Sequence, residues 1–397
     1  MLLISNSARQ AVRTINFMRV LHKKSCRIVT IAWKRDSNDI DNCEEYGCSE
    51  VELIEGRHIL AYMIKALIVG FRYPSDIYVT IDIRLIPILL VLSKFKKNSI
   101  VIYDSKELPS VTAKAYLDRN KWPEFLNPIK KFIYNLYEYF EKKCFQSIDG
   151  ILCLDSRDNF LLKKARKLNP NSVVIMNAVD INKVLAYKSY RKYHEIYKDK
   201  QVVVFSGNLY PDKGLFQYMQ MSKILKEKIP DFKLVLCGAI KMEVKEFQTM
   251  LSTYGIEEYV DVFRRLPFNE HIGLLMCCKV GLALMSSKRP KFKMIGPGTA
   301  QKIFTYMAAG LPIITSKGHF ARIIEEERCG IAVDFFDVTE LIWAVRWLLE
   351  DEKTRMQMAR NALRATAIRY NMEIEGRKIC QIIDRAFENK IKNALKS

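Results

Sequence analysis

The chain has 397 residues and a formal net charge of +20, with 49% hydrophobic and 27% charged residues. This composition is ordinary for a soluble globular protein. No segment is predicted to span a membrane, because the most apolar one, residues 85–92, contains Pro87 and is far shorter than about 20 residues. The length exceeds what one hydrophobic core organises, so we expect two domains. The charge predicts attraction to a nucleotide, an anionic membrane surface or a nucleic acid.

The cysteines and the first residues indicate a cytoplasmic chain. Residues 1–5 are too short for the apolar region of a signal peptide and lack its basic start, so we interpret them as a buried strand. The ten cysteines show no regular framework and are interpreted as reduced thiols. Cys43 and Cys48 have no second Cys or His pair at metal-ligand spacing, so the sequence predicts no metal site.

Residues 7–21 are predicted to form a helix with one basic side. Its alanine, valine, isoleucine and methionine residues share a face, whereas Arg9 and Arg13 fall elsewhere. In one interpretation this helix faces the core and its basic side is solvated. In the other, Arg9 and Arg13 contact an acceptor or an anionic membrane, where each basic residue adds about 1 kcal/mol.

Short apolar runs alternate with helical stretches along the first half of the chain. The runs predicted to be strands are residues 2–5, 27–32, 77–81, 99–103, 150–154 and 172–176. Their spacing favours parallel βαβ units. Asp82 directly follows one of these runs, where a carboxylate either faces a ligand or caps a helix.

The second half of the chain repeats this pattern. Its predicted strands are residues 202–205, 232–237, 260–263, 280–285, 313–315 and 331–333. Residues 179–200 are polar, basic and rich in tyrosine, which indicates a domain boundary. We therefore expect one Rossmann-like domain at 1–185, a second at 186–370 and a long amphipathic helix at 371–397. A ligand is expected between the domains, at the carboxyl ends of the strands.

Two strand–turn–helix motifs in the second half predict a site for a diphosphate. Residues 202–214, VVVFSGNLYPDKG, end an apolar run at Gly207 and place Lys213 before a helix. Residues 296–312, GPGTAQKIFTYMAAGLP, place glycines ahead of a second helix. Glycines let a backbone approach a ligand closely, and the first N–H groups of a helix bind anions.

These motifs resemble those of the GT-B glycosyltransferases of the large retaining family 4, and the resemblance covers nearly the whole chain. The family pattern G-R-L-x-x-x-K-G matches residues 207–214, and A-M-A-A-G-x-P closely matches residues 306–312. Residues 329–331 and 333–334 match further downstream. The resemblance implies an α/β GT-B fold, in which two Rossmann-like domains with parallel sheets face each other across a cleft. It also implies that the helix at 371–397 packs back on the N-terminal domain.

The resemblance further implies a donor site in the C-terminal domain. Its members here are Gly207, Asn208, Lys213, Gly298, Thr299, Ala300, Gln301, Lys302 and Thr305. Lys213 is placed on the donor diphosphate as a catalytic residue, and Asn208 replaces the usual arginine. Pro297 and Thr305 occupy the positions of two glutamates in relatives. A hydroxyl forms one neutral hydrogen bond of about 1 kcal/mol, so Thr305 should hold a ribose less tightly than a carboxylate does.

In the N-terminal domain, residues 103–108, YDSKEL, are similar to a Y-D-S-H-E-L stretch of relatives. The histidine of that stretch faces the reacting centre, and Lys106 takes its place here. The resemblance makes Lys106 and Asp82 further candidates for catalysis. The basic residues of the loop 286–293 are candidates for contact with a diphosphate or a lipid-diphosphate acceptor.

The sequence is thus interpreted as a metal-independent, cofactor-free hexosyltransferase. Its expected donor is a UDP- or GDP-linked sugar, and its acceptor is a hydroxyl of a glycan or lipid-linked glycan in bacterial cell-surface polysaccharide synthesis. It is expected in the cytoplasm, peripheral on the inner face of the membrane. The leading alternative is an inactive GT-B subunit that binds or stabilises a partner glycosyltransferase.

Two other classes are less favoured. A metal-dependent GT-A enzyme would need the D-x-D motif that residues 39–41 offer, but this lies in an early polar loop and the fold has no place for the later motifs. A nucleic-acid binder should interleave exposed aromatic and basic residues on a stacking surface, and none stands out in the sequence.

Overall fold

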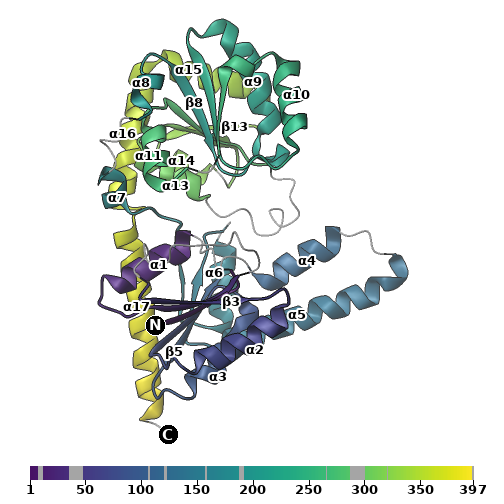
Figure 1. Cartoon of the computed structure of the whole chain (residues 1–397), viewed down its shortest axis with the longest axis vertical. Coiled ribbons are helices and arrows are strands. Elements are labelled where there is room, and N and C mark those ends of the chain that lie inside the picture. Colours follow the sequence, from purple (N-terminus) through teal and green to yellow (C-terminus); the bar gives the residue numbers. More distant parts are fainter. Residues whose placement is uncertain are drawn as a thin grey trace. The chain divides into compact units, whose positions relative to one another are not determined.

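The computed structural model describes residues 1–7, 12–34, 48–105, 108–119, 123–156, 159–186, 192–264, 266–286, 300–319 and 321–395. These residues divide into two compact units, shown in Figure 1. The first unit contains the described residues up to Asn177 together with those from Met372 onward, and the second lies within residues 178–371.

A seven-stranded parallel sheet organises the described residues of the first unit. Its strands are β1 (Leu2–Ser5), β2 (Val29–Lys34), β3 (Glu50–Glu55), β4 (Ile77–Thr80), β5 (Ile100–Ser105), β6 (Gly150–Cys153) and β7 (Ser172–Val174). Their order is β3-β2-β1-β4-β5-β6-β7. The register pairs Ser5 with Ala32 and Ile4 with Thr80. The order reverses direction at the pair β1 and β4, which is the switch point of a doubly wound sheet.

Helices cover both faces of this sheet. They are α1 (Val12–His22), α2 (Ile59–Gly70), α3 (Ile86–Ser93), α4 (Pro109–Arg119), α5 (Asn127–Ser147), α6 (Phe160–Leu168) and α17 (Met372–Ala394), with short 3-10 turns η2 (Ile83–Leu85) and η3 (Glu124–Leu126). Because side chains alternate across a strand, Leu2 and Ile4 pack with α2, α3, α5 and α6, whereas Leu3 packs with α1 and α17. The last helix of the chain therefore completes the core of the first unit (Figure 1).

The second unit holds a six-stranded parallel sheet in its described part. The strands are β8 (Gln201–Ser206), β9 (Phe232–Cys237), β10 (Val260–Phe263), β11 (Val280–Ala283), β12 (Ile313–Ser316) and β13 (Gly330–Val333), in the order β10-β9-β8-β11-β12-β13. Its helices are α7 (Ile181–Ala186), α8 (His194–Tyr197), α9 (Leu215–Lys228), α10 (Val244–Tyr254), α11 (Phe268–Met276), α13 (Gln301–Ala308), α14 (Arg322–Glu326), α15 (Val338–Glu350) and α16 (Glu352–Ile368), with 3-10 turns η5 (Pro211–Lys213) and η6 (Glu257–Tyr259).

The α/β class with two parallel sheets is confirmed, and each run predicted as a strand overlaps a strand of the structure. One strand was missed. The sequence of β3, EVELIE, is rich in glutamate, and only Ile54 of its six residues is buried. It lies at the edge of the sheet, where one side of the strand faces solvent, so its sequence lacks a continuous apolar run.

The predicted basic outer side of the first helix is wrong for Arg13. Its side chain is buried, and its Nε donates to Asp104 Oδ1 of β5 at 2.6 Å. One of its terminal nitrogens, Nη1, donates to the carbonyl oxygen of Ile175, also at 2.6 Å. Arg13 thus ties α1 to the sheet and does not face a membrane or an acceptor. Arg9 lies outside the described residues.

Candidate functional site

In the second unit, the carboxyl ends of β8 and β11 form the switch point of the sheet. Ligands of open α/β sheets bind outside this point. Gly207 follows β8, the turn η5 leads from there to α9, and α13 begins at Gln301. The predicted donor residues Gly207, Lys213 and Lys302 therefore belong to elements that meet at one edge of the sheet.

Gly207 adopts a backbone conformation that favours glycine, with φ of +131°. Its N–H donates to the carbonyl oxygen of Cys237 at 2.8 Å, which joins the end of β8 to that of β9. Gly238, which also has positive φ, packs directly on the Gly207 backbone and leaves no room for a Cβ atom. The two glycines bring the backbones after β8 and β9 together at the site. The sequence analysis did not single out Gly238.

Lys302, in the first turn of α13, directs its ammonium group at this glycine turn. A Cβ atom built on Gly207 would lie 3.1 Å from Lys302 Nζ, and Nζ lies 3.5 Å from the ring centroid of Phe205. Burial lowers the pKa of Lys302 well below its usual value, and the positive charge of Lys213 lowers it further. Among the described residues, no carboxylate forms an ion pair with Lys302. The site thus holds two lysines whose charges repel each other.

Several hydrogen bonds among buried groups fix the end of β8 at Ser206. The Ser206 N–H donates to the hydroxyl oxygen of Tyr306 at 2.6 Å, and that hydroxyl donates to the Leu282 carbonyl oxygen at 3.3 Å. Ser206 Oγ lies 2.7 Å from Nε2 of His271, a residue of α11. Burial lowers the pKa of His271 to about 4. His271 is therefore neutral at pH 7, and sequence reasoning missed it because no motif connects α11 to β8.

The remainder of the predicted second motif has a structural role. Phe304, Tyr306 and Met307 are buried in the core, and Gly310 ends α13 with φ of +73°. The Thr305 side chain is 5% exposed, and its hydroxyl donates to the Gln301 carbonyl oxygen at 3.2 Å within the helix. This geometry explains Thr305 without a ligand, so its contact with a ribose stays a prediction.

The remaining predicted donor residues differ in how far the structure places them. Asn208 is exposed beside Gly207, and Ala300 and Gln301 are partly buried at the start of α13. No side chain of the described residues caps that helix start. Gly298 and Thr299 lie outside the described residues, as do Lys106, Pro297 and residues 287–293 of the basic loop.

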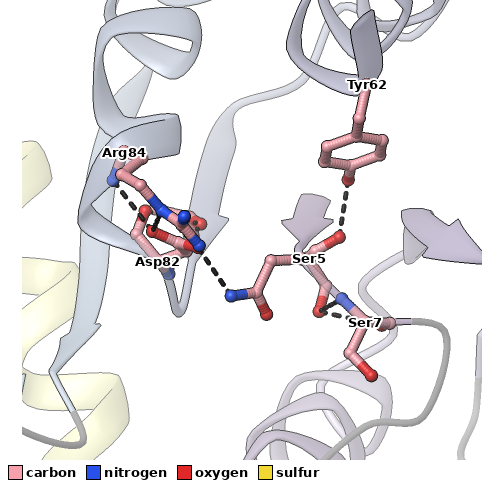
Figure 2. A network of polar contacts seen from close by, with 7 residues as sticks. Ser5, Ser7, Tyr62, Asp82 and Arg84 are labelled. Carbon is pink, nitrogen blue, oxygen red and sulfur yellow. Dashed lines mark hydrogen bonds and ion pairs between the residues drawn. The ribbon is translucent and has the colours of Figure 1, made fainter. Parts of the chain in front are cut away.

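The switch point of the first sheet carries a second polar cluster, shown in Figure 2. Asn6 follows β1, and its Nδ2 donates to Asp82 Oδ2 at 2.6 Å. Arg84 donates to both carboxylate oxygens of Asp82, at distances of 2.6 to 3.2 Å. The Arg84 backbone N–H donates to Asp82 Oδ1, so Asp82 caps η2. Nearby, the Tyr62 hydroxyl donates to the Ser5 carbonyl oxygen and fixes the end of β1.

This geometry assigns different roles to Asp82 and Arg84. Burial alone would raise the pKa of Asp82, but the hydrogen bonds and charge of Arg84, with the bond from Asn6, hold it below its usual value. Asp82 is buried, and both of its oxygens already accept hydrogen bonds. The Arg84 side chain is 47% exposed, so it is more accessible to a ligand than Asp82. The sequence predicted Asp82 and missed Arg84.

Comparison with solved structures defines the fold class as GT-B. HepE of Anabaena, solved with UDP, aligns with 96% of this chain and 99% of its own at a TM-score of 0.71 and 15% identity. The sucrose-phosphate synthase of Thermosynechococcus elongatus aligns with 98% of this chain and 99% of its own, with a TM-score of 0.71 and 14% identity. At these identities the likeness establishes the fold alone.

Sequence comparison gives a family match for the second unit. Residues 187–365 match the family model of glycosyl transferases group 1. The YtcC protein of Bacillus subtilis (strain 168), named as a candidate glycosyltransferase, is 26% identical over 183 residues, which are 44% of this chain. The alpha-D-kanosaminyltransferase of Streptomyces kanamyceticus is 22% identical over 186 residues, or 46% of this chain. These matches span 42% and 45% of the two relatives, so less than half of each is compared.

Proposed function

We propose that this chain is a glycosyltransferase that moves a hexosyl group from a nucleotide diphosphate sugar to a hydroxyl of a glycan or lipid-linked glycan. The lysines at the end of β8 carry the proposal. Lys302 has a lowered pKa and no carboxylate partner among the described residues, and Lys213 lies close enough to repel it. Two cations held together at a glycine turn are stabilised by an anion with two negative groups. A diphosphate has this character.

The same two lysines supply the chemistry that the transfer needs. When a nucleotide sugar reacts, negative charge grows on the leaving diphosphate, and fixed cations and N–H dipoles stabilise it. Lys213, Lys302 and the first N–H groups of α13 are proposed to do this without a metal ion. Retention of anomeric configuration, as the resemblance implies, would let the leaving phosphate accept the proton of the acceptor hydroxyl.

One comparison supports a nucleotide sugar as donor, and a second supports a role in cell-surface polysaccharide synthesis. HepE was solved with UDP and with UDP-glucose, and 96% of this chain aligns with it. WaaG, described as a glycosyltransferase of lipopolysaccharide biosynthesis, aligns with 96% of this chain at a TM-score of 0.65 and 15% identity. We propose a UDP-linked donor first and a GDP-linked donor second, with an acceptor in cell-surface polysaccharide synthesis at the cytoplasmic face of the membrane.

Calorimetric titration with UDP, GDP, ADP and CMP tests the donor site. We expect one nucleoside diphosphate to bind, and Lys213→Ala and Lys302→Met each to weaken it at least about tenfold, since each removes a charge-assisted contact of about 1.5–3 kcal/mol. Lys223→Ala, which changes an exposed lysine of α9, is the matched control. Equal binding by all three variants would contradict the proposed site.

A GT-B subunit without transferase activity remains the second candidate. The hydroxyl of Thr305, which replaces a glutamate of relatives, is bound to its own helix and offers little to a ribose. Hydrolysis of UDP-sugars distinguishes the two functions, because glycosyltransferases release UDP slowly when water replaces the acceptor. Binding of a nucleotide without release of UDP from any UDP-sugar or GDP from any GDP-sugar would favour the inactive subunit.

A further inference from the structure

The outer surface of three neighbouring helices in the first unit exposes an unusual number of large apolar side chains. We call this surface the apolar helix face. It comprises Leu60, Ile64 and Ile68 of α2 with Phe71 just after it, Val91 of α3 with Phe95 just after it, Phe125 of η3, and Ile129, Phe132, Leu136 and Tyr139 of α5. Each of these side chains is between 40% and 78% exposed. Exposed apolar patches of this kind mark interaction sites in soluble proteins.

The helices of this face cover the same side of the sheet and lie next to one another. α2, α3 and α5 all contribute to the core that contains Leu2 and Ile4, and Figure 1 shows them side by side. Phe71 and Phe95 join α2 to α3 through an edge contact between rings 4.9 Å apart. The exposed residues of α2 follow a spacing of three or four, opposite the buried Tyr62, Ala66 and Gly70. They therefore point away from the sheet and do not serve the core.

Most charged residues in and just after these helices are lysines, of which Lys96 is paired with Asp76 at 3.3 Å. Residues 59–71, 86–97 and 125–143 contain one, three and four lysines, and their only acidic residues are Glu138 and Glu141. Both glutamates are engaged by Lys164 of α6, at 3.6 and 3.2 Å. The exposed lysines Lys65, Lys131 and Lys142 form no ion pair with any described residue. The face thus combines apolar side chains with an excess of positive charge, carried by Lys65, Lys131 and Lys142.

We propose that the apolar helix face binds the surface of an anionic phospholipid bilayer. Aliphatic and aromatic side chains enter the boundary between head groups and acyl chains, while flanking lysines meet lipid phosphates. Two copies of this face would place lysines against lysines, and protein interfaces are depleted in lysine, so charge disfavours a second copy. Aliphatic residues such as Leu60, Ile64 and Ile129 offer nothing to stack on nucleic-acid bases.

The inference deepens the proposed function, because it rests on the lipid-linked acceptor proposed above. It also moves the predicted membrane contact away from α1, whose Arg13 is buried, to the opposite side of the first sheet. Binding of α2, α3 and α5 to a bilayer would keep the first unit beside an acceptor that is anchored in the same bilayer.

Sedimentation of the full-length protein with vesicles tests this proposal. One set contains phosphatidylcholine alone, and the other contains phosphatidylcholine with phosphatidylglycerol. We expect binding to the anionic vesicles only, reduced at least about tenfold both by Ile64→Ser with Phe132→Ser and by Lys131→Glu with Lys142→Glu. The control, Val244→Ser with Trp343→Ser, replaces residues of the second unit with similar exposure and should leave binding unchanged.

Other outcomes would overturn the proposal. These are no binding of the wild-type protein to anionic vesicles, equal binding by all variants, or a dimer by light scattering that the serine variant converts to monomers. Preferential binding of single-stranded RNA over vesicles would also overturn it. UDP titration of the same variants separates this test from the donor site, because the donor lysines lie in the second unit and should bind UDP as before.

Discussion

Among individual residues, His271 carries the clearest consequence for pH dependence. Burial lowers its pKa to about 4 in the folded protein, whereas an exposed histidine in the unfolded chain titrates near 6.5. Between these pH values the unfolded chain binds one more proton than the folded protein. Protonation therefore favours unfolding, and the stability that neutral His271 preserves at pH 7 is lost as the pH falls from about 6.5 towards 4.

We predict that protonation of His271 alone lowers the free energy of unfolding by about 2–3 kcal/mol between pH 7 and pH 4.5. Urea denaturation at both pH values measures the change. His271→Gln retains a polar partner for Ser206 but does not titrate, so its stability should fall less by about that amount. His194→Gln is the matched control, since the His194 side chain is 58% exposed. An identical pH dependence in wild type and His271→Gln would show that the shift does not contribute.

The same site shows what single residues reveal before a structure is known. Lys213 and Lys302 stand in motifs with glycines and helix starts, so the sequence could point to them. His271 stands in no such motif. It reaches Ser206 only because α11 follows β10, two strands away from β8 in the same sheet. Contacts made by chain topology leave no local pattern, and in the first unit the contact of Asn6 with Asp82, 76 residues further along the chain, left none either.

Among elements, α1 is fixed by a buried ion pair that its sequence disguises. Arg13 and Asp104 are each at most 6% exposed, and their side chains meet at 2.6 Å. Helical periodicity places Arg13 off the apolar face of α1, which indicated a solvated position. The prediction failed because a helix on a parallel sheet is covered from more than one direction. In this unit α17 packs beside α1 as well as on the sheet.

We predict that Arg13→Ala destabilises the protein by about 3–5 kcal/mol, because it leaves the Asp104 carboxylate buried without its partner. Thermal and urea denaturation measure this loss. The double variant Arg13→Met with Asp104→Leu should recover much of it, since it removes both charges and keeps the volume. Arg27→Ala breaks an exposed ion pair with Glu50 and should cost less than about 1 kcal/mol. Equal effects of Arg13→Ala and Arg27→Ala would contradict the buried role.

The positions of strands were easier to predict than the contacts around helices. The edge strand β3 was the exception. Interior strands of a parallel sheet are buried on both faces, so they appear as continuous apolar runs. β8, for example, has five buried residues of six. β3 is an edge strand in which Glu50 and Glu52 are only half-buried on the same side as Ile54, and both accept from the Tyr73 hydroxyl. Such a strand is recognised through its partners and not through its own composition.

For the whole molecule, the path of the chain matters because the first unit is built from both ends of the chain. The chain leaves the first unit after Asn177, builds the second, and returns to the first with α17. There Ile379, Ile382 and Ile383 are at most 6% exposed. Asn171 donates to the Ile382 carbonyl oxygen at 2.9 Å, and the Met176 N–H donates to Glu375 at 2.9 Å. The first unit therefore depends on the end of the chain, which follows the whole second unit in the sequence.

This connectivity predicts that loss of α17 unfolds one unit and spares the other. Burial of each isoleucine contributes about 1.5–3 kcal/mol, so three of them approach the total stability of about 5–15 kcal/mol of a domain. In a chain truncated after Asn371, hydrogen exchange should become fast in β1, β4 and β5 and stay slow in β8, β9 and β11. Ile382→Ala should shift the first set alone, by about 2–5 kcal/mol, and the exposed Ile391→Ala should shift neither. Slow exchange in β1 after truncation would mean that the first unit folds without its last helix, and equally fast exchange in both sets would mean that the two units unfold as one.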